Sequence, residues 1–121
     1  MTVENPYFEE VAGGITVGAN RASWDNRAIE VLKQREELVQ EYAWAIPNEE
    51  AIETVAEHAP IVEVGAGAGY WAWCVEQLDV RIVATDPEPP WNDPYTEIIT
   101  KTATEAIECA REVFVDGYTL F

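Results

Sequence analysis

Short runs of apolar, largely β-branched residues recur along the second half of the chain, separated by longer segments of mixed polarity. These runs occupy residues 61–64, 81–85, 96–100 and 118–121. Runs of this length are typical of strands buried on both faces of a parallel sheet, with helices as crossover connections. The pattern predicts an α/β fold with a Rossmann-like parallel sheet of about four strands, and right-handed crossovers in the usual half-sheet arrangement predict the order 3-2-1-4.

Helical spacing of apolar residues marks the segments around these runs. Ser23 and Asn48 are suitable N-caps for two helices before the first strand, and acids fill the first turns after Asn48. The predicted helices run from Trp24 to about Trp44, from Asn48 toward His58, from Tyr70 to Leu78, and from Thr102 or Thr104 to about Phe114. We expect the two N-terminal helices to cover one face of the sheet.

The first 22 residues lack this periodicity and contain Pro6 and three glycines. They are predicted to form a loose arm that packs through a few side chains. Residues 23–121 then form a single domain, because 121 residues suffice for one domain with a modest core.

The most informative stretch is P-I-V-E-V-G-A-G-A-G-Y at residues 60–70. A strand, a turn with glycines on alternate positions and a helix follow one another, which directs backbone N–H groups toward an anionic or polar ligand. Glycine permits the tight turn and a close approach of ligand to backbone. A glycine-rich turn without any ligand is the alternative interpretation.

The spacing of the glycines argues against the dinucleotide fingerprint. G-x-G-x-x-G would require a third glycine at position 70, where this chain has Tyr70. A nucleotide or NAD binder that uses Asp86 is therefore disfavoured, although it stays open. The actual spacing, E-x-G-x-G-x-G from Glu63, resembles motif I of the class I S-adenosylmethionine-dependent methyltransferases. Asp86, at the end of the second predicted strand, resembles the next marker of that family.

Two further segments strengthen this resemblance. Tyr42–Pro47 reads Y-A-W-A-I-P, and Gly69–Ala72 reads G-Y-W-A. Both are similar to a methyltransferase-like group known mainly from haloarchaeal and eukaryotic genome sequences. The resemblance covers roughly residues 38 to 121.

The resemblance implies that the chain binds S-adenosylmethionine as a small-molecule cofactor. The glycines would border its methionine part, Glu63 would hold its amino group, and Asp86 would bind the ribose hydroxyls. The implied cofactor-binding residues are Glu63, Gly65, Ala66, Gly67, Gly69, Tyr70, Asp86 and Pro87. The loop after the third strand lies near the adenine in this family, which makes Ala103 and Glu105 further candidates.

Aromatic residues near the expected site have two interpretations. Trp91 and Tyr95 could line an adenine or substrate site, or they could only cover the edge of the sheet. Trp71 lies close to the expected cofactor, whereas Trp73 is better explained by packing against the sheet, as aromatic residues often are.

Complete members of the family continue beyond the fourth strand into the part that supplies the substrate site, so the resemblance covers the cofactor-binding half. It identifies no methyl acceptor and no catalytic residue, and we do not infer turnover from it. A non-catalytic structural or interaction protein that retains the scaffold is the alternative.

Charge excludes some partners. The chain has 23 acidic and 7 basic residues, a net charge of −16, so it lacks the basic surface that binds nucleic acid. The acids are dispersed and lysine is scarce, which resembles proteins of salt-loving organisms, where ions screen self-repulsion. An ordinary acidic protein is the alternative.

Two cysteines, Cys74 and Cys109, and one histidine, His58, form no zinc-binding or Cys–His catalytic pattern. We expect no metal and reduced thiols. No apolar run approaches a membrane span, and Met1–Glu10 does not resemble a signal peptide, which predicts a cytoplasmic protein without a membrane partner.

The predicted strand order leaves Tyr118–Phe121 at an edge of the sheet. Unpaired backbone groups at an edge are a template for another strand. We therefore expect a homodimer or a partner chain at this edge, unless the N-terminal arm folds over it.

Overall fold

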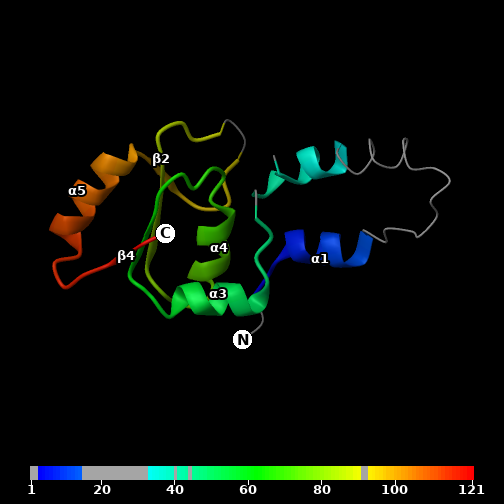
Figure 1. Cartoon of the computed structure of the whole chain (residues 1–121), viewed down its shortest axis with the longest axis horizontal. Coiled ribbons are helices and arrows are strands. Elements are labelled where there is room, and N and C mark those ends of the chain that lie inside the picture. Colours follow the sequence, from blue (N-terminus) through cyan, green and yellow to red (C-terminus); the bar gives the residue numbers. More distant parts are fainter. Residues whose placement is uncertain (1–2, 15–32, 40, 44, 91–92) are drawn as a thin grey trace.

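The computed structural model describes residues 3–14, 33–39, 41–43, 45–90 and 93–121. The elements in this part of the chain form an α/β arrangement around a small sheet (Figure 1). They are α1 (Pro6–Gly14), helical residues 33–39, α3 (Glu49–Ala56), β1 (Ile61–Glu63), α4 (Tyr70–Glu76), β2 (Ile82–Asp86), β3 (Ile98–Thr100), α5 (Ala103–Val113) and β4 (Thr119–Leu120).

The sheet confirms the predicted topology. Its four strands are all parallel in the order β3-β2-β1-β4. Ile61 lies opposite Ile82 on one side and Thr119 on the other, so β1 is a central strand. Each strand begins and ends within two residues of its predicted bounds. The central strand β1 is buried along its whole length, as its apolar run predicts.

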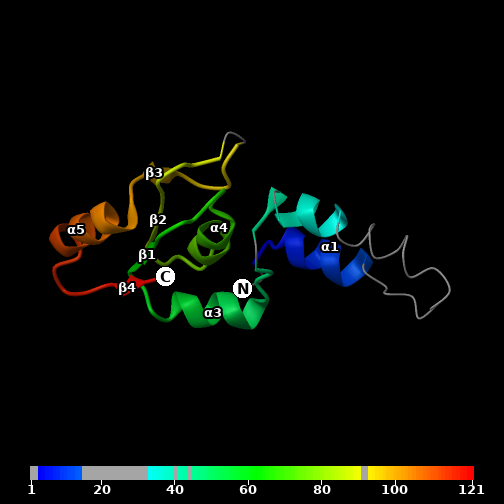
Figure 2. The ribbon, with the colours of Figure 1, turned by 45° about the horizontal axis from the view of Figure 1, so that its top comes forward.

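Helices cover both faces of this sheet (Figure 2). On one face, Ile61 packs in a core cluster that includes Ile52 from α3 and Val75 from α4. On the other face, Val62 packs against Ala106 and Ala110 of α5. The alternation along β1 therefore assigns Ile61 and Glu63 to the α4 face and Val62 to the α5 face.

Two predicted caps are confirmed. The Asn48 side chain accepts a hydrogen bond from the Ala51 N–H at 2.8 Å, which starts α3. Thr102, rather than Thr104, caps α5 in a capping box with Glu105. Residues 33–39 are helical, as predicted, and the prediction from Trp24 to residue 32 lies outside the described residues.

The expected loose arm is wrong for its first part, because Pro6–Gly14 forms helix α1. The Phe8 N–H donates to the side chain of Asn5 at 3.3 Å, and Pro6 occupies the first helical position, where its missing N–H is harmless. This segment contacts α4, Pro47 and Tyr42: Glu4 bonds to Gln77, Asn5 bonds to Pro47, and the Tyr42 hydroxyl donates to Glu10 at 2.8 Å. Among the described residues these contacts fasten α1 beside α4.

Strand β4 lies at the outer edge of the sheet, as the sequence predicts. The side chain of Leu120 is 49% exposed and that of Phe121 is 42% exposed. Self-association through this edge stays a prediction. Within the described part of the chain, no helix is both long and apolar enough to cross a bilayer.

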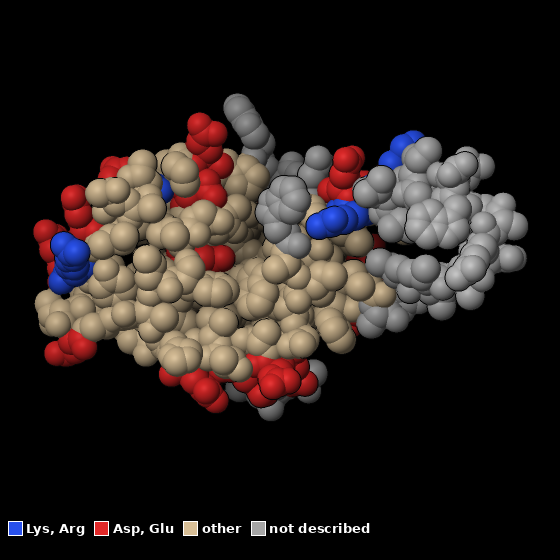
Figure 3. All heavy atoms as spheres, viewed as in Figure 1, with Lys and Arg blue, Asp and Glu red and all other residues tan. Residues whose placement is uncertain are grey.

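Acidic side chains lie over several elements of the described surface, with few basic ones between them (Figure 3). With a net charge of −16, we expect the free energy of unfolding to fall markedly at low ionic strength. The screening length is about 30 Å at 0.01 M salt and about 3 Å at 1 M, so molar salt should remove most of the repulsion. Melting curves in sodium chloride measure this. An equal melting temperature at both concentrations would refute a destabilising self-repulsion.

Candidate functional site

The glycine-rich turn links the carboxyl end of β1 to α4. Gly65, Gly67 and Gly69 all have positive φ values, of 65°, 58° and 78°. Hydrogen bonds shape the turn from within and from β2: the Gly69 N–H donates to Ala66 O, and the Ala66 N–H donates to Thr85 O, each at 2.9 Å. The turn therefore has a defined conformation that residues with a Cβ rarely adopt.

Gly69 is the glycine that tolerates a side chain least. A Cβ there would lie 2.5 Å from Cδ1 of Ile98 and 3.1 Å from Cγ2 of Thr96, whereas a Cβ on Gly67 would meet nothing within 4 Å. The close packing of α4 against β3 thus depends on Gly69.

We expect Gly69→Ala to lower the free energy of unfolding by about 2–3 kcal/mol, of which the left-handed conformation accounts for about 1–2. Gly67→Ala is the matched control, because it has a similar φ and open space, and should cost only the backbone part. Urea unfolding of both variants gives the comparison. Equal losses of unfolding free energy in the two variants would show that the Ile98 side chain moves away from the new Cβ without an energetic cost.

Asp86 ties this turn to the loop after β2. Its Oδ2 accepts a hydrogen bond from the Gly67 N–H at 2.9 Å, and its Oδ1 accepts one from the Glu88 N–H at 2.8 Å. Pro87, between these residues, is exposed. Asp86 therefore holds the glycine turn in the conformation that a ligand would meet. It lies with the predicted residues Gly65, Ala66 and Gly67 at the carboxyl ends of β1 and β2.

Glu63 is a buried acid at the end of β1. Glu63 is 7% exposed, and its Oε2 has no hydrogen-bond partner among the described residues. Burial raises the pKa of Glu63 from its ordinary value of 4.5 to about 7, although the nearby Ala72 amide opposes this rise. Buried carboxylate oxygens normally have a partner, so this acceptor requires an explanation.

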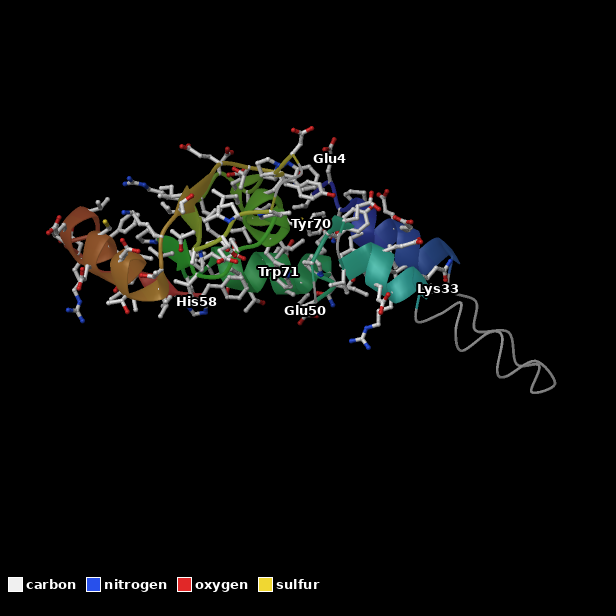
Figure 4. All side chains as sticks on the ribbon, turned by 90° about the horizontal axis from the view of Figure 1, so that it is seen from above. Glu4, Lys33, Glu50, His58, Tyr70 and Trp71 are labelled. Atoms are coloured by element: carbon white, nitrogen blue, oxygen red, sulfur yellow. The ribbon has the colours of Figure 1, made fainter. Side chains whose placement is uncertain are left out.

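The Tyr70 side chain points away from the turn into the core. It is fully buried, its hydroxyl donates to Asn5 Oδ1, and it accepts the Tyr7 N–H at 3.0 Å. Figure 4 shows Tyr70 and Trp71 leaving α4 in different directions. Of the predicted site residues, Tyr70 therefore brings only its backbone to the turn.

Tyr95 also packs into this aromatic cluster. Its ring centroid lies 4.9 Å from that of Tyr70 and 5.4 Å from that of Trp73. The Tyr95 N–H donates to Ala68 O, which fixes the loop before β3 against the glycine turn. Packing accounts for Tyr95 and for Trp73, and Trp91 lies outside the described residues.

Ala103 and Glu105 stand at the start of α5 and are exposed. Hydrogen bonds from Thr102 hold the pKa of Glu105 below its ordinary value. Glu105 thus has a local role in the capping box. The structure does not place its carboxylate against the glycine turn.

Phe121, which the sequence analysis did not connect with the site, pairs with Glu63 across the sheet and contacts Trp71. Phe121 exchanges backbone hydrogen bonds with the residues on either side of Glu63, Val62 and Val64. The Trp71 ring contacts the Phe121 ring in an edge-to-face pair at 5.5 Å. Only the strand order and register could have identified Phe121, whereas Trp71 carried the G-Y-W-A resemblance.

Other reactive side chains offer little chemistry here. Cys74 is buried, and burial raises its pKa to about 11, so the thiol stays protonated at neutral pH. Cys109 is exposed on α5. In the ranges that the structure describes, no three His, Cys, Asp or Glu side chains gather in a way that could hold a metal ion.

Comparison with known proteins found no matching family model, no matching curated protein and no matching solved structure. The functional argument therefore rests on the arrangement of residues at the carboxyl ends of β1 and β2.

Proposed function

We propose that this chain is an S-adenosylmethionine-binding, methyltransferase-like protein. The observation that carries the proposal is Glu63, a buried carboxyl directly before the glycine turn, one of whose oxygens has no partner in the part of the chain that the structure describes. A ligand ammonium group would satisfy this oxygen and neutralise the charge, which few neutral ligands could do. The turn itself offers close approach to backbone, since Gly65 is exposed.

Asp86 supports the same ligand. The two amide hydrogen bonds use only part of the acceptor capacity of its carboxylate, which has about four lone-pair sites. Ribose hydroxyls can therefore bind without breaking the contacts that hold the turn. We infer that Asp86 both orders the turn and binds the ribose.

The charges at the carboxyl ends of β1 and β2 favour a cationic ligand over a phosphate. Glu63, Asp86 and Glu88 stand at or just after the strand ends, and each would repel a phosphate. Lys101 follows β3 nearby, where its charge interacts with Glu105. Together with Tyr70 at the third glycine position of the dinucleotide fingerprint, these charges disfavour NAD and nucleotides.

Titration calorimetry in molar salt tests the proposal. Wild-type protein should bind S-adenosylmethionine and S-adenosylhomocysteine, and should not bind ATP or NAD. Asp86→Asn should weaken binding by about 1.5–3 kcal/mol, because a hydrogen bond to a charged acceptor is replaced by a neutral one. Glu97→Gln, which neutralises an exposed acid outside the site, is the control.

Failure of the wild-type protein to bind either adenosyl compound at millimolar concentration would refute the proposal. A non-catalytic structural or interaction protein that keeps this scaffold would then be the better explanation. Dispersed acids and scarce lysine also lead us to propose a salt-rich setting, which the melting curves in salt described above test.

A further inference from the structure

Phe121 is the neighbour of Glu63 across the sheet. Ile61 pairs with Thr119 and Val62 with Leu120. The Phe121 N–H donates to Val62 O at 2.9 Å, and the Val64 N–H donates to Phe121 O at 3.0 Å, which continues the same register. Phe121 therefore lies opposite Glu63.

Both side chains point to the face that α4 covers. Side chains that are opposite in a parallel register share a face, and Ile61, two residues before Glu63, packs in the cluster of α3 and α4. Trp71, in the first turn of α4, contacts Phe121 on that face with ring centroids 5.5 Å apart. Phe121 is thus a neighbour of Glu63 across the sheet and of Trp71 on α4.

The Trp71 ring is held in place, yet part of the aromatic pair is accessible. Trp71 Nε1 donates to Ala45 O at 3.2 Å, which fixes its ring between α4 and the segment before α3. Trp71 is half-buried, whereas the Phe121 side chain is 42% exposed. Part of the aromatic pair is therefore accessible on the face of the sheet that Glu63 also occupies.

The pair occupies the position where this topology favours binding. β1 continues into α4 on one face, whereas β4 follows α5 on the other, so the connections diverge between β1 and β4. Ligands of open parallel sheets bind outside the carboxyl ends of the strands at such a switch point. Glu63 and Phe121 are the paired residues at this point.

We propose that Trp71 and Phe121 form an aromatic wall that selects the sulfonium group of the ligand, while Glu63 holds its ammonium group. This inference rests on the proposed function and adds two specificity-determining residues to it. Three carbon atoms separate the nitrogen and sulfur of the methionine part, and adjacent strands lie about 4.8 Å apart, so the two cationic groups can face neighbouring strands. Aromatic faces attract such cations most strongly where water is excluded.

The surroundings of Glu63 agree with a cationic ligand. Burial raises the pKa of its carboxyl, and the Ala72 amide opposes this rise. Among the described residues, Oε2 of Glu63 has no hydrogen-bond partner, so a ligand ammonium group could bind there. Aromatic rings carry no positive charge that would compete with this group.

Comparison of S-adenosylmethionine with S-adenosylhomocysteine tests the wall, because both carry the ammonium and adenosine groups and only the first carries the sulfonium. Phe121→Leu and Trp71→Leu keep apolar bulk and remove the aromatic face. Each should raise the Kd for S-adenosylmethionine about three- to tenfold and that for S-adenosylhomocysteine less than twofold. Phe121→Tyr and Trp71→Phe retain a ring and should keep the wild-type ratio of the two constants.

The outcomes separate this inference from the proposed function. If both compounds bind and neither Leu variant changes the ratio of their Kd values, the aromatic wall is refuted and the cofactor proposal stands. If neither compound binds, trimethylsulfonium is titrated against sodium at constant ionic strength, with the amide signals of Gly65 and Phe121 as the readout. Shifts that disappear in Phe121→Leu would support the wall, and their absence in wild-type protein would overturn it.

Discussion

Glu63→Gln is expected to make the protein much more stable than wild type at pH 8, and only slightly more stable at pH 5. Burial raises the pKa of Glu63 from 4.5 to about 7, so between these values the folded state binds more protons than the unfolded state. The stability that a protonated Glu63 contributes is therefore full below pH 4.5 and is lost as the pH rises through 7. The glutamine side chain of the variant has the shape of the protonated acid and does not titrate.

The size of this effect follows from the shift. The rise in the pKa of Glu63 corresponds to about 3 kcal/mol of unfolding free energy, or on the order of 10 °C in melting temperature for a domain of this length. Melting temperatures of both proteins between pH 5 and 8 in molar salt measure the difference. Salt at this level screens the repulsion among the other acids, which both proteins share.

Glu53→Gln is the control, because Glu53 is exposed on α3. Its melting temperature should follow that of the wild type across the range. A constant difference between Glu63→Gln and wild type would mean that Glu63 is not titrating in this window. Saturating S-adenosylmethionine should reduce the advantage of the variant, because an ammonium group beside Glu63 favours the ionised form.

Local signals made most of the fold predictable. Strands β1, β2 and β3 are each marked by a run of β-branched residues, and Asn48 and Thr102 mark helix starts through their side chains. Helix α1 was not predicted, because Pro6 and the glycines of this segment indicated a loose arm. Asn followed by Pro at the first helical position is a recognisable signal for such a helix.

The site was predictable in its backbone but not in its side chains. The glycine turn and Asp86 follow from spacing along the chain, whereas the direction of the Tyr70 ring depends on Asn5 and Tyr7, more than sixty residues earlier. Phe121 becomes a neighbour of Glu63 only through the register of β4 with β1. Contacts between distant segments carry no signal in a single sequence.

Tyr70→Ala is expected to cost about 3–5 kcal/mol, which is a large share of the stability of a small domain. The ring is fully buried, and it makes edge-to-face contacts with Tyr42 and Tyr95 at centroid distances of 5.2 and 4.9 Å. Such pairs contribute about 0.5–1.5 kcal/mol each beyond the area that they bury. Urea unfolding measures the loss, and a loss below about 1 kcal/mol would show that the cluster repacks around the missing ring.

Tyr70→Phe separates the hydroxyl from the ring. The hydroxyl accepts the Tyr7 N–H, one of the first-turn donors of α1 that no helical carbonyl can satisfy, and it donates to Asn5. Removing it leaves this buried donor unpaired, at a cost of about 1–3 kcal/mol. Because the lost contacts are with α1, amide exchange should accelerate in residues 7–11 more than in β1 and β2. Tyr118→Phe, on the α5 face, should leave α1 protected, and equal acceleration throughout the sheet would contradict a local fastening of α1 by Tyr70.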